Sequence, residues 1–412
     1  MLFSRWLQTL DQSSDRIALI EGAERLTFSD LHERLAKLPK ANDPVIARGS
    51  AVEIVVSVLQ GWRDSQPVLP LEKGAAIPDL PATPHPAGTA HLKLTPGIEG
   101  KPRAVFFSAE QIAADADRLV AAMGLRHEVP NLAAVSLTHS YGFSSIILPL
   151  LLHGVPVHAV EVPFPKVMAD AIAEHDGVVL PGVPSMWKAW HRSGILREAK
   201  IALAVSAGAP LSLELERAVF ADCGLKLHNF YGASECGGIS YDASETPRES
   251  AADLGSPLPG VSVKLCESGR LLVESSSVAL AYESAREGET LGDGRFLTQD
   301  FGRIENGRVM LESSGAESIN VAGRKIGPAK IETALMASGL VVRARAFGVP
   351  SHDPERVEEI TAIVELKSGT LEQLRQRMTE VLAGWEMPRH WEAASDDTVW
   401  SMSRADLKKR WS

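Results

Sequence analysis

The feature that most constrains the fold is a series of short apolar segments between residues 104 and 230, each followed by a loop of small and polar residues. The predicted strands are Ala104–Phe107, Ala133–Leu137, Val178–Leu180, Ala202–Val205 and Lys226–Phe230. Helical segments separate them, and one begins at the capping box Ser108–Gln111 and continues to about Met123. Strands that alternate with helices indicate a mostly parallel sheet, in which ligands bind beyond the carboxyl ends of the strands. The polar loops fall at those ends.

The flanking regions predict further elements. Leucines at helical spacing predict a helix over residues 31–38 behind a Ser29 N-cap, and the prolines of residues 76–91 predict an exposed connection. From about Gly255 the chain changes to a small antiparallel module, with strands expected at 261–265, 269–275 and 307–313. The elements expected after Ser313 are helices at 329–336 and 371–382 and strands at 341–347 and 360–366.

These patterns predict an α/β protein of two domains, because 412 residues exceed the roughly 250–300 at which a single core stops growing. Residues 1–312 are expected to form a large N-terminal domain of parallel-sheet βα subdomains plus a small β module. Residues 313–412 are expected to form a small, mobile α+β C-terminal domain, since about 100 residues suffice for a separate core.

Composition excludes several classes of function. The chain carries 42 Lys+Arg against 52 Asp+Glu, a formal net charge of −10, without the clustered basic residues that nucleic acid binding needs. The spacing of Cys223, Cys236 and Cys266 fits neither a disulfide framework nor a zinc site. Apolar runs stay below the roughly 18 residues of a membrane span, and the first residues contain no long apolar segment. We therefore expect a cytoplasmic protein without membrane insertion and without a nucleic acid partner.

Several motifs stand in a fixed order along the chain. They are His139–Gly142, Pro181–Trp187, Ser206–Leu211, His228–Gly238 (HNFYGASECGG), Leu254–Gly260, Thr298–Arg303, Asn320–Glu332 and Gly384–Arg389. Their sequences and order resemble the adenylate-forming superfamily, which contains acyl- and aryl-CoA synthetases, adenylation domains and luciferases. The resemblance covers roughly residues 15 to 411, and order and spacing together are more specific than any single motif. Alone, the YGASE segment would also suit an ordinary glycine turn after a strand.

The resemblance implies ATP and Mg²⁺ as cofactors and assigns roles to residues. Tyr231 would stack on adenine, Glu235 would hold Mg²⁺, and Asp300 would accept both ribose hydroxyls. The expected nucleotide-binding residues are Thr95, Gly97, Gly100, Arg103, Gly208, Ala209, Pro210, Asn229, Tyr231, Gly232, Ser234, Asp300 and Arg303. The expected acid-binding residues are His139, Tyr141, Gly142, Val183, Ser206, Gly208, Gly232, Gly237 and Gly238. The expected catalytic residues are His139, Glu235 and Arg404, and the expected thiol tunnel contains Gly323, Arg324 and Lys325.

The implied reaction has two halves. A carboxylate attacks the α-phosphate of ATP to give an acyl-adenylate and pyrophosphate, and a thiol then takes the acyl group. The expected pocket has small or apolar residues and no aspartate to bind an α-amino group, which favours an aryl or aliphatic carboxylic acid. The acceptor is either coenzyme A or the phosphopantetheine of a carrier protein, and the basic residues near the C-terminus suit both.

The sequence departs from the family at positions that contact phosphate. In the segment Thr95–Arg103, Pro96 and Ile98 remove hydroxyl groups and Glu99 adds an anion, although Lys101 and Arg103 offset part of that charge. Ser313 and Ser314 align with the family's Gly-Arg linker. Arg404 aligns with the position of the family's catalytic lysine. Lys408 or Lys409 would take that position only if the loop slips by one turn.

Three hypotheses stay open at this point. The first is a working acid–thiol ligase, which the presence of Tyr231, Glu235 and Asp300 favours. The second is a degenerate homologue that binds nucleotide or an acyl group as the partner of another enzyme. The third is an unrelated doubly wound α/β enzyme, but the chain has no GxSxG, GxxxxGK[ST] or GxGxxG motif to support it.

Overall fold

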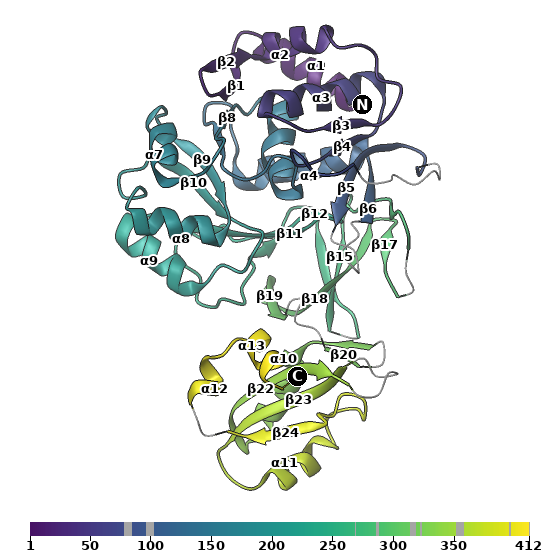
Figure 1. The fold of residues 1–412 in the computed structure, drawn as a ribbon, viewed down its shortest axis with the longest axis vertical. Coiled ribbons are helices and arrows are strands. Elements are labelled where there is room, and N and C mark those ends of the chain that lie inside the picture. The colour runs from purple at the N-terminus through teal and green to yellow at the C-terminus, as the bar shows by residue number, and fades with distance from the viewer. Residues whose placement is uncertain are drawn as a thin grey trace. The chain divides into compact units, whose positions relative to one another are not determined.

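A computed structural model describes residues 1–77, 85–95, 103–267, 269–285, 288–313, 319–321, 324–351, 358–394 and 397–411. Figure 1 shows the fold, with a colour that runs from purple at the N-terminus to yellow at the C-terminus. The chain divides into two compact units. The first comprises residues 1–263, 272–297 and 305–309, and the second comprises residues 264–271, 298–304 and 310–412. The predicted domain boundary at residue 312 stays a prediction.

Two sheets form the centre of the first unit. The larger has nine strands in the order β13-β12-β11-β10-β9-β7-β8-β1-β2. These are β13 (Ser256–Pro257), β12 (Gly237–Tyr241), β11 (Leu227–Ala233), β10 (Ile201–Ser206), β9 (Val178–Gly182), β7 (Asn131–Ala133), β8 (Val157–Ala159), β1 (Ile17–Glu21) and β2 (Glu24–Thr27). Pairing from β11 to β1 is parallel, and the edge pairs are antiparallel. The expected mostly parallel sheet is therefore confirmed.

The second sheet of this unit has five strands in the order β16-β6-β5-β4-β3. These are β16 (Ala281–Tyr282), β6 (Arg103–Ser108), β5 (Thr89–Thr95), β4 (Val68–Pro70) and β3 (Val45–Ala47). The helical segments of the unit are α1 (Leu2–Ser13), α2 (Phe28–Ala36), α3 (Ala51–Asp64), α4 (Ala109–Met123), α5 (Ser140–Gly142), the π-helical η2 (Phe143–Ile147), α6 (Leu148–His153), α7 (Pro165–Ala173), α8 (Pro184–Ser193) and α9 (Leu213–Cys223). Helices α7, α8 and α9 share one apolar core with β9, β10 and β11 (Figure 1).

The smaller module and the C-terminal region complete the chain. The module contains β14 (Ser262–Leu265), β15 (Arg270–Glu274), β17 (Leu291–Gly292), β18 (Arg295–Glu305) and β19 (Arg308–Ser313). The C-terminal region contains β20 (Ile319–Val321), β21 (Arg324–Ile326), α10 (Pro328–Ala337), β22 (Val341–Pro350), β23 (Glu358–Leu366), α11 (Leu371–Met378), β24 (His390–Ala393), α12 (Asp397–Ser401) and α13 (Arg404–Trp411). Strands β22, β23 and β24 form one sheet, so the α+β character expected after Ser313 is confirmed.

Four local predictions were wrong. Residues 89–91 of the predicted exposed connection belong to β5, where His91 is fully buried. The strand predicted at Ala104–Phe107 lies on β6, which pairs antiparallel with β5 in the second sheet and is not part of the parallel one. The strand predicted at Ala133–Leu137 lies at Asn131–Ala133, because Ala134–Leu137 is a buried loop whose apolar residues mimic a strand. The N-cap predicted at Ser29 is Thr27, whose side chain accepts from the Asp30 backbone while Asp30 accepts from the Thr27 backbone. The capping box at Ser108 and Gln111 is confirmed, as is the helix end at Met123.

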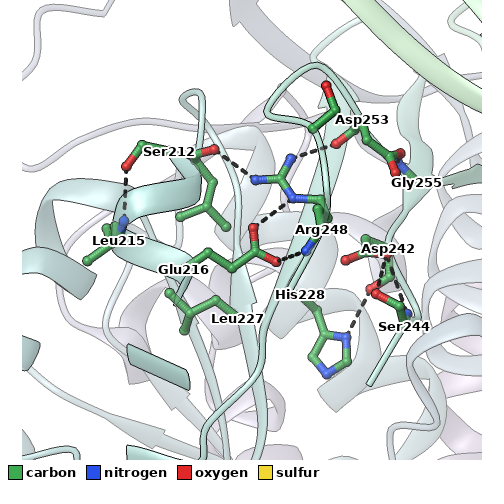
Figure 2. Close-up of polar contacts among 12 residues, drawn as sticks. Ser212, Leu215, Glu216, Leu227, His228, Asp242, Ser244, Arg248, Asp253 and Gly255 are labelled. Carbon is green, nitrogen blue, oxygen red and sulfur yellow. Dashed lines mark hydrogen bonds and ion pairs between the residues drawn. The ribbon is translucent and has the colours of Figure 1, made fainter. Parts of the chain in front are cut away.

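A buried charge network fastens the segment after β12 to α9. Glu216 accepts from the Arg248 side chain at 2.9 Å and also forms a short ion pair with Lys226. Lys226 donates to Asp242 at 2.7 Å, and Asp242 accepts in turn from Arg308 at 2.8 Å. Figure 2 shows Arg248 between Glu216 and the loop that contains Asp253. Because every charge has a partner, the network tolerates complete burial of Glu216.

Substitution of Glu216 by Gln should lower the free energy of unfolding by about 3–5 kcal/mol, because Lys226 and Arg248 would keep buried charges without their common partner. The matched control is Glu214→Gln, an exposed carboxylate in the same helical turn, which should cost less than ~1 kcal/mol. Urea unfolding of the three proteins measures both values, and equal losses would contradict the role given to the network.

Asp242 should make the free energy of unfolding depend on pH in acidic solution. Burial alone would raise the pKa of Asp242, but hydrogen bonds from Lys226 and Arg308 outweigh it and place that pKa below its ordinary value of 3.8. The stabilisation is therefore present above pH 3.8 and lost as pH falls through the folded pKa. In Arg308→Met the folded pKa of Asp242 should rise toward 3.8, so this variant should lose less of its remaining stability than the wild type as the pH falls below 3.8, as thermal unfolding between about pH 2 and 6 would show.

Candidate functional site

The site begins where the parallel strands β9 and β10 end beside β11, which continues four residues farther to Ala233. Ser206, the last residue of β10, is in register with Gly182 at the end of β9 and with Asn229 on β11. Parallel pairing puts the loops that follow these strands at one edge of the sheet. Val183, Ser206 and Asn229, which belong to three separately predicted motifs, are thus brought together. Ser206 is fully buried, and its hydroxyl has no hydrogen-bond partner among the described residues.

Helix α5 joins the same edge from another part of the chain. The Ser140 hydroxyl donates to the Ser234 hydroxyl at 3.0 Å, and the Tyr141 hydroxyl donates to the Val205 carbonyl at 3.3 Å. Burial raises the pKa of Tyr141, so its hydroxyl stays protonated. A Cβ atom at Gly142 would lie 2.1 Å from the Ser136 carbonyl oxygen, so only glycine fits there. His139 is exposed at the start of α5.

The turn between β11 and β12 carries the YGASE segment. Gly232 pairs with Gly238 and Ala233 with Gly237, so the turn contains Ser234, Glu235 and Cys236. Gly237 has φ +73°, a backbone conformation that favours glycine. Tyr231 precedes the turn and is partly exposed, and Gly208, Ala209 and Pro210 form an exposed loop after β10. The fold therefore places the predicted residues of this segment at the same edge as α5.

Glu235 is the carboxylate that the sequence assigns to Mg²⁺. Its Oε1 accepts from the Tyr282 hydroxyl at 3.1 Å, and its backbone carbonyl accepts from Ala279 at 2.9 Å. Burial raises the pKa of Glu235 above its usual 4.5, although the Tyr282 hydrogen bond and the charges of Arg103 and Lys93 oppose this shift. No group of three or more acidic, histidine or cysteine side chains forms a metal cage in the described part of the chain.

A single carboxylate with one oxygen left for a ligand fits the way Mg²⁺ binds with nucleotides, through one or two carboxylates, phosphates and water. Glu235 would supply the protein ligand, and the cation would neutralise charge that develops on the phosphates. The residues thus fit Mg²⁺ held mainly by its nucleotide.

Arg103 lies near Glu235 at the start of β6 but is already paired. Its guanidinium donates to both carboxylate oxygens of Glu289, at 2.8 and 2.9 Å, and its centre lies 3.5 Å from the centroid of the Tyr282 ring. Thr95, at the end of β5, donates its hydroxyl to the Arg103 carbonyl at 3.4 Å. The predicted Gly97 and Gly100 lie outside the described residues. A phosphate that binds Arg103 must therefore compete with Glu289.

Sequence analysis missed two buried polar residues beneath this region. Lys93 is 6% exposed, with its ammonium 3.5 Å from the Ser144 hydroxyl and 4.7 Å from the centroid of the Phe107 ring. Burial lowers the pKa of Lys93, and the negative charges of Asp115 and Glu235 oppose that shift. His91 stacks on Phe143, and burial and the charge of Lys93 keep the pKa of His91 well below 6.5. The available signal was that His91, Lys93 and Thr95 share one face of a strand.

A cavity in the first unit lies beside His139. It has a volume of about 190 Å³ and separates the end of β4 from the start of α5. Its lining includes Leu71, Glu72, Thr138, His139 and Phe143. The cavity gives His139 an open space next to the proposed acid site.

The remaining predicted residues belong to the second unit. Asp300 and Arg303 lie on β18, and Arg303 is 3.5 Å from Glu312. Arg404, the first residue of α13, donates to both carboxylate oxygens of Glu332 at 2.9 Å. Gly323 lies outside the described residues, and Arg324 and Lys325 lie on β21. The roles predicted for these residues stay predictions.

Relatives with known names agree on one class of enzyme. The chain is 25% identical over 370 residues to a malonate–CoA ligase of Arabidopsis thaliana, which covers 78% of this chain and 60% of that protein. It is 33% identical over 150 residues to a long-chain-fatty-acid–CoA ligase of Mycobacterium bovis, covering 35% of this chain and 24% of that protein. The chain thus spans between about a quarter and three fifths of these relatives.

Solved structures share the fold over the whole chain. A fatty acyl CoA synthetase of Mycobacterium tuberculosis has a TM-score of 0.79 at 16% identity and covers 100% of this chain and 98% of its own. An o-succinylbenzoate CoA synthetase of Bacillus subtilis, in complex with an acyl-adenylate intermediate, has a TM-score of 0.68 at 20% identity and covers 98% of both chains. These neighbours support the α/β architecture of a large N-terminal and a small C-terminal part.

The family model that describes AMP-binding enzymes matches residues 36–282, more than half of the chain. That range contains the strand ends of β9, β10 and β11, helix α5 and Glu235. The chain therefore belongs to the family of AMP-binding enzymes.

Proposed function

We propose that the protein is an ATP-dependent acid–thiol ligase of the cytoplasm. It would activate an apolar aryl or aliphatic carboxylic acid as an acyl-adenylate and pass the acyl group to the thiol of coenzyme A or of a carrier-protein phosphopantetheine. The curated relatives are named as CoA ligases for acids as different as malonate and long-chain fatty acids, so they support the reaction class and leave the acid open.

One observation carries the proposal. Motifs from residues 139–142, 181–187, 206–211 and 228–238 are far apart in the sequence, yet strand register and the contacts of α5 gather them at one sheet edge. Glu235 lies in the turn between β11 and β12. One of its carboxylate oxygens accepts from Tyr282, and the other would bind a cation. A nucleotide, a cation and an acid need such a shared edge, because adenylation depends mainly on positioning and on charge neutralisation.

A second function is supported by the ion pairs of two arginines. Arg103 is bound by Glu289, and Arg404 is bound by Glu332, although both were expected to act on the nucleotide. A degenerate homologue that binds nucleotide or an acyl group without complete ligase activity would have the same contacts. The two functions differ in whether pyrophosphate is released.

The proposed ligase should release pyrophosphate from ATP·Mg²⁺ when offered a panel of aryl and aliphatic acids. Glu235→Gln should lower that rate by about 10–100-fold, because the cation loses an anionic ligand. Glu214→Gln, an exposed change on α9, should leave the rate unaltered. ATP binding without pyrophosphate release from any acid would favour the degenerate homologue, and absence of both would exclude the ligase.

Asp300→Ala should weaken nucleotide binding by about 1–3 kcal/mol if its carboxylate accepts hydrogen bonds from the ribose. The control is Gln299→Ala, because successive residues of a strand point to opposite faces. Calorimetric titration with ATP measures both affinities. An unchanged affinity in the Asp300 variant would remove this residue from the nucleotide site.

A further inference from the structure

Lys93 is a buried cation without an ion pair to any described carboxylate. It lies on β5, between α4 and the π-helical η2, and in the described part of the chain its hydrogen-bond partner is the Ser144 hydroxyl. Burying an ammonium in this way is costly unless nearby negative charge offsets it. Burial lowers the pKa of Lys93, and the negative charges of Asp115 and Glu235 oppose that shift.

Asp115 is equally buried and contacts the turn that carries Glu235. It is 3% exposed, and its Oδ1 accepts from the Gly238 backbone N–H at 2.9 Å. Its Oδ2 has no hydrogen-bond partner among the described residues. A Cβ atom at Gly237 would lie 2.3 Å from the Asp115 carboxylate, so the backbone of the turn packs directly on this side chain.

A second tie to the same turn starts one helical turn later in α4. Arg118 donates to the Ser277 hydroxyl at 2.8 Å, and that hydroxyl donates to the Cys236 carbonyl at 2.7 Å. Helix α4 therefore holds the turn at Cys236 and at Gly238, and Glu235 is the residue before Cys236. Neither Asp115 nor Arg118 belongs to the motifs that the sequence analysis singled out.

We propose that Lys93 and Asp115 are positioning residues of the Glu235 turn, and that their opposite buried charges set how strongly this turn binds a divalent cation. The inference rests on the proposed role of Glu235. Asp115 adds negative charge beneath the cation and fixes the turn through Gly238, and Lys93 adds positive charge that opposes cation binding. Because residues behind a metal ligand tune metal affinity, both charges act without touching the cation.

The test measures the affinity for Mn²⁺, which takes the place of Mg²⁺. Binding is measured by electron paramagnetic resonance, because the signal of the free ion is lost when Mn²⁺ binds. The titration uses the full chain with an ATP analogue that cannot be cleaved between its α- and β-phosphates. Lys93→Met should tighten Mn²⁺ binding and Asp115→Asn should weaken it, each by about tenfold. The double variant should return to within about twofold of the wild type, because opposite charges are removed together.

Changes of Mn²⁺ affinity in opposite directions distinguish this role from a loss of folding stability, which would weaken Mn²⁺ binding in both variants. Lys93→Gln removes the charge with a different shape and should match Lys93→Met, which keeps the test valid if one variant folds poorly. Lys188→Met, on the exposed face of α8, is the matched control. Shifts in the same direction, or affinities equal to that of the control, would overturn the inference while leaving the ligase intact. A wild type that binds neither the analogue nor Mn²⁺ would overturn both proposals.

Discussion

The parallel pairing of β9, β10 and β11 is the constraint on which the candidate site depends. Backbone hydrogen bonds put Gly182, Ser206 and Asn229 side by side, and a shift of one residue would turn the Ser206 and Asn229 side chains to the opposite face of the sheet. The apolar core that these strands share with α7, α8 and α9 fixes the register. The position of the site residues at the strand ends therefore depends on the apolar side chains that are buried on the faces of these strands.

The site combines this rigid edge with charges that neutralise one another. Arg103 pairs with Glu289 and stacks on Tyr282, and the Tyr282 hydroxyl donates to Glu235. Beneath them, Asp115 holds the Glu235 turn, and Lys93 and Arg118 carry buried positive charges. Positive and negative groups thus surround the place where a polyphosphate and its cation would bind, and binding must rearrange existing pairs.

Sequence patterns predicted the fold well where burial repeats with the period of the element. The strands at β9, β10 and β11 and the helix α4 were found because their apolar spacing and capping residues agree. The strand at β7 was misplaced, because a buried loop is as apolar as a strand. Thr27 was overlooked as a cap because Ser29 has the same chemistry two residues later.

The parts of the site that sequence missed depend on contacts between distant segments. In β5, the residues His91, Lys93 and Thr95 alternate with leucines, a pattern typical of a strand with one solvated face, yet both faces are buried. Nothing local in the sequence reveals that Asp115 reaches Gly238, 123 residues later, or that Glu289 occupies Arg103. Motif matching finds the residues that touch a ligand and overlooks those that support them.

The tight approach of Gly142 to the Ser136 carbonyl has a practical consequence for redesign. Any side chain at this position would push α5 away from the strand ends and move Tyr141 with it. A library built to change the acid of the proposed ligase should keep glycine at position 142. Diversity belongs at Tyr141 and Val183, which lie at the strand ends and have side chains to vary.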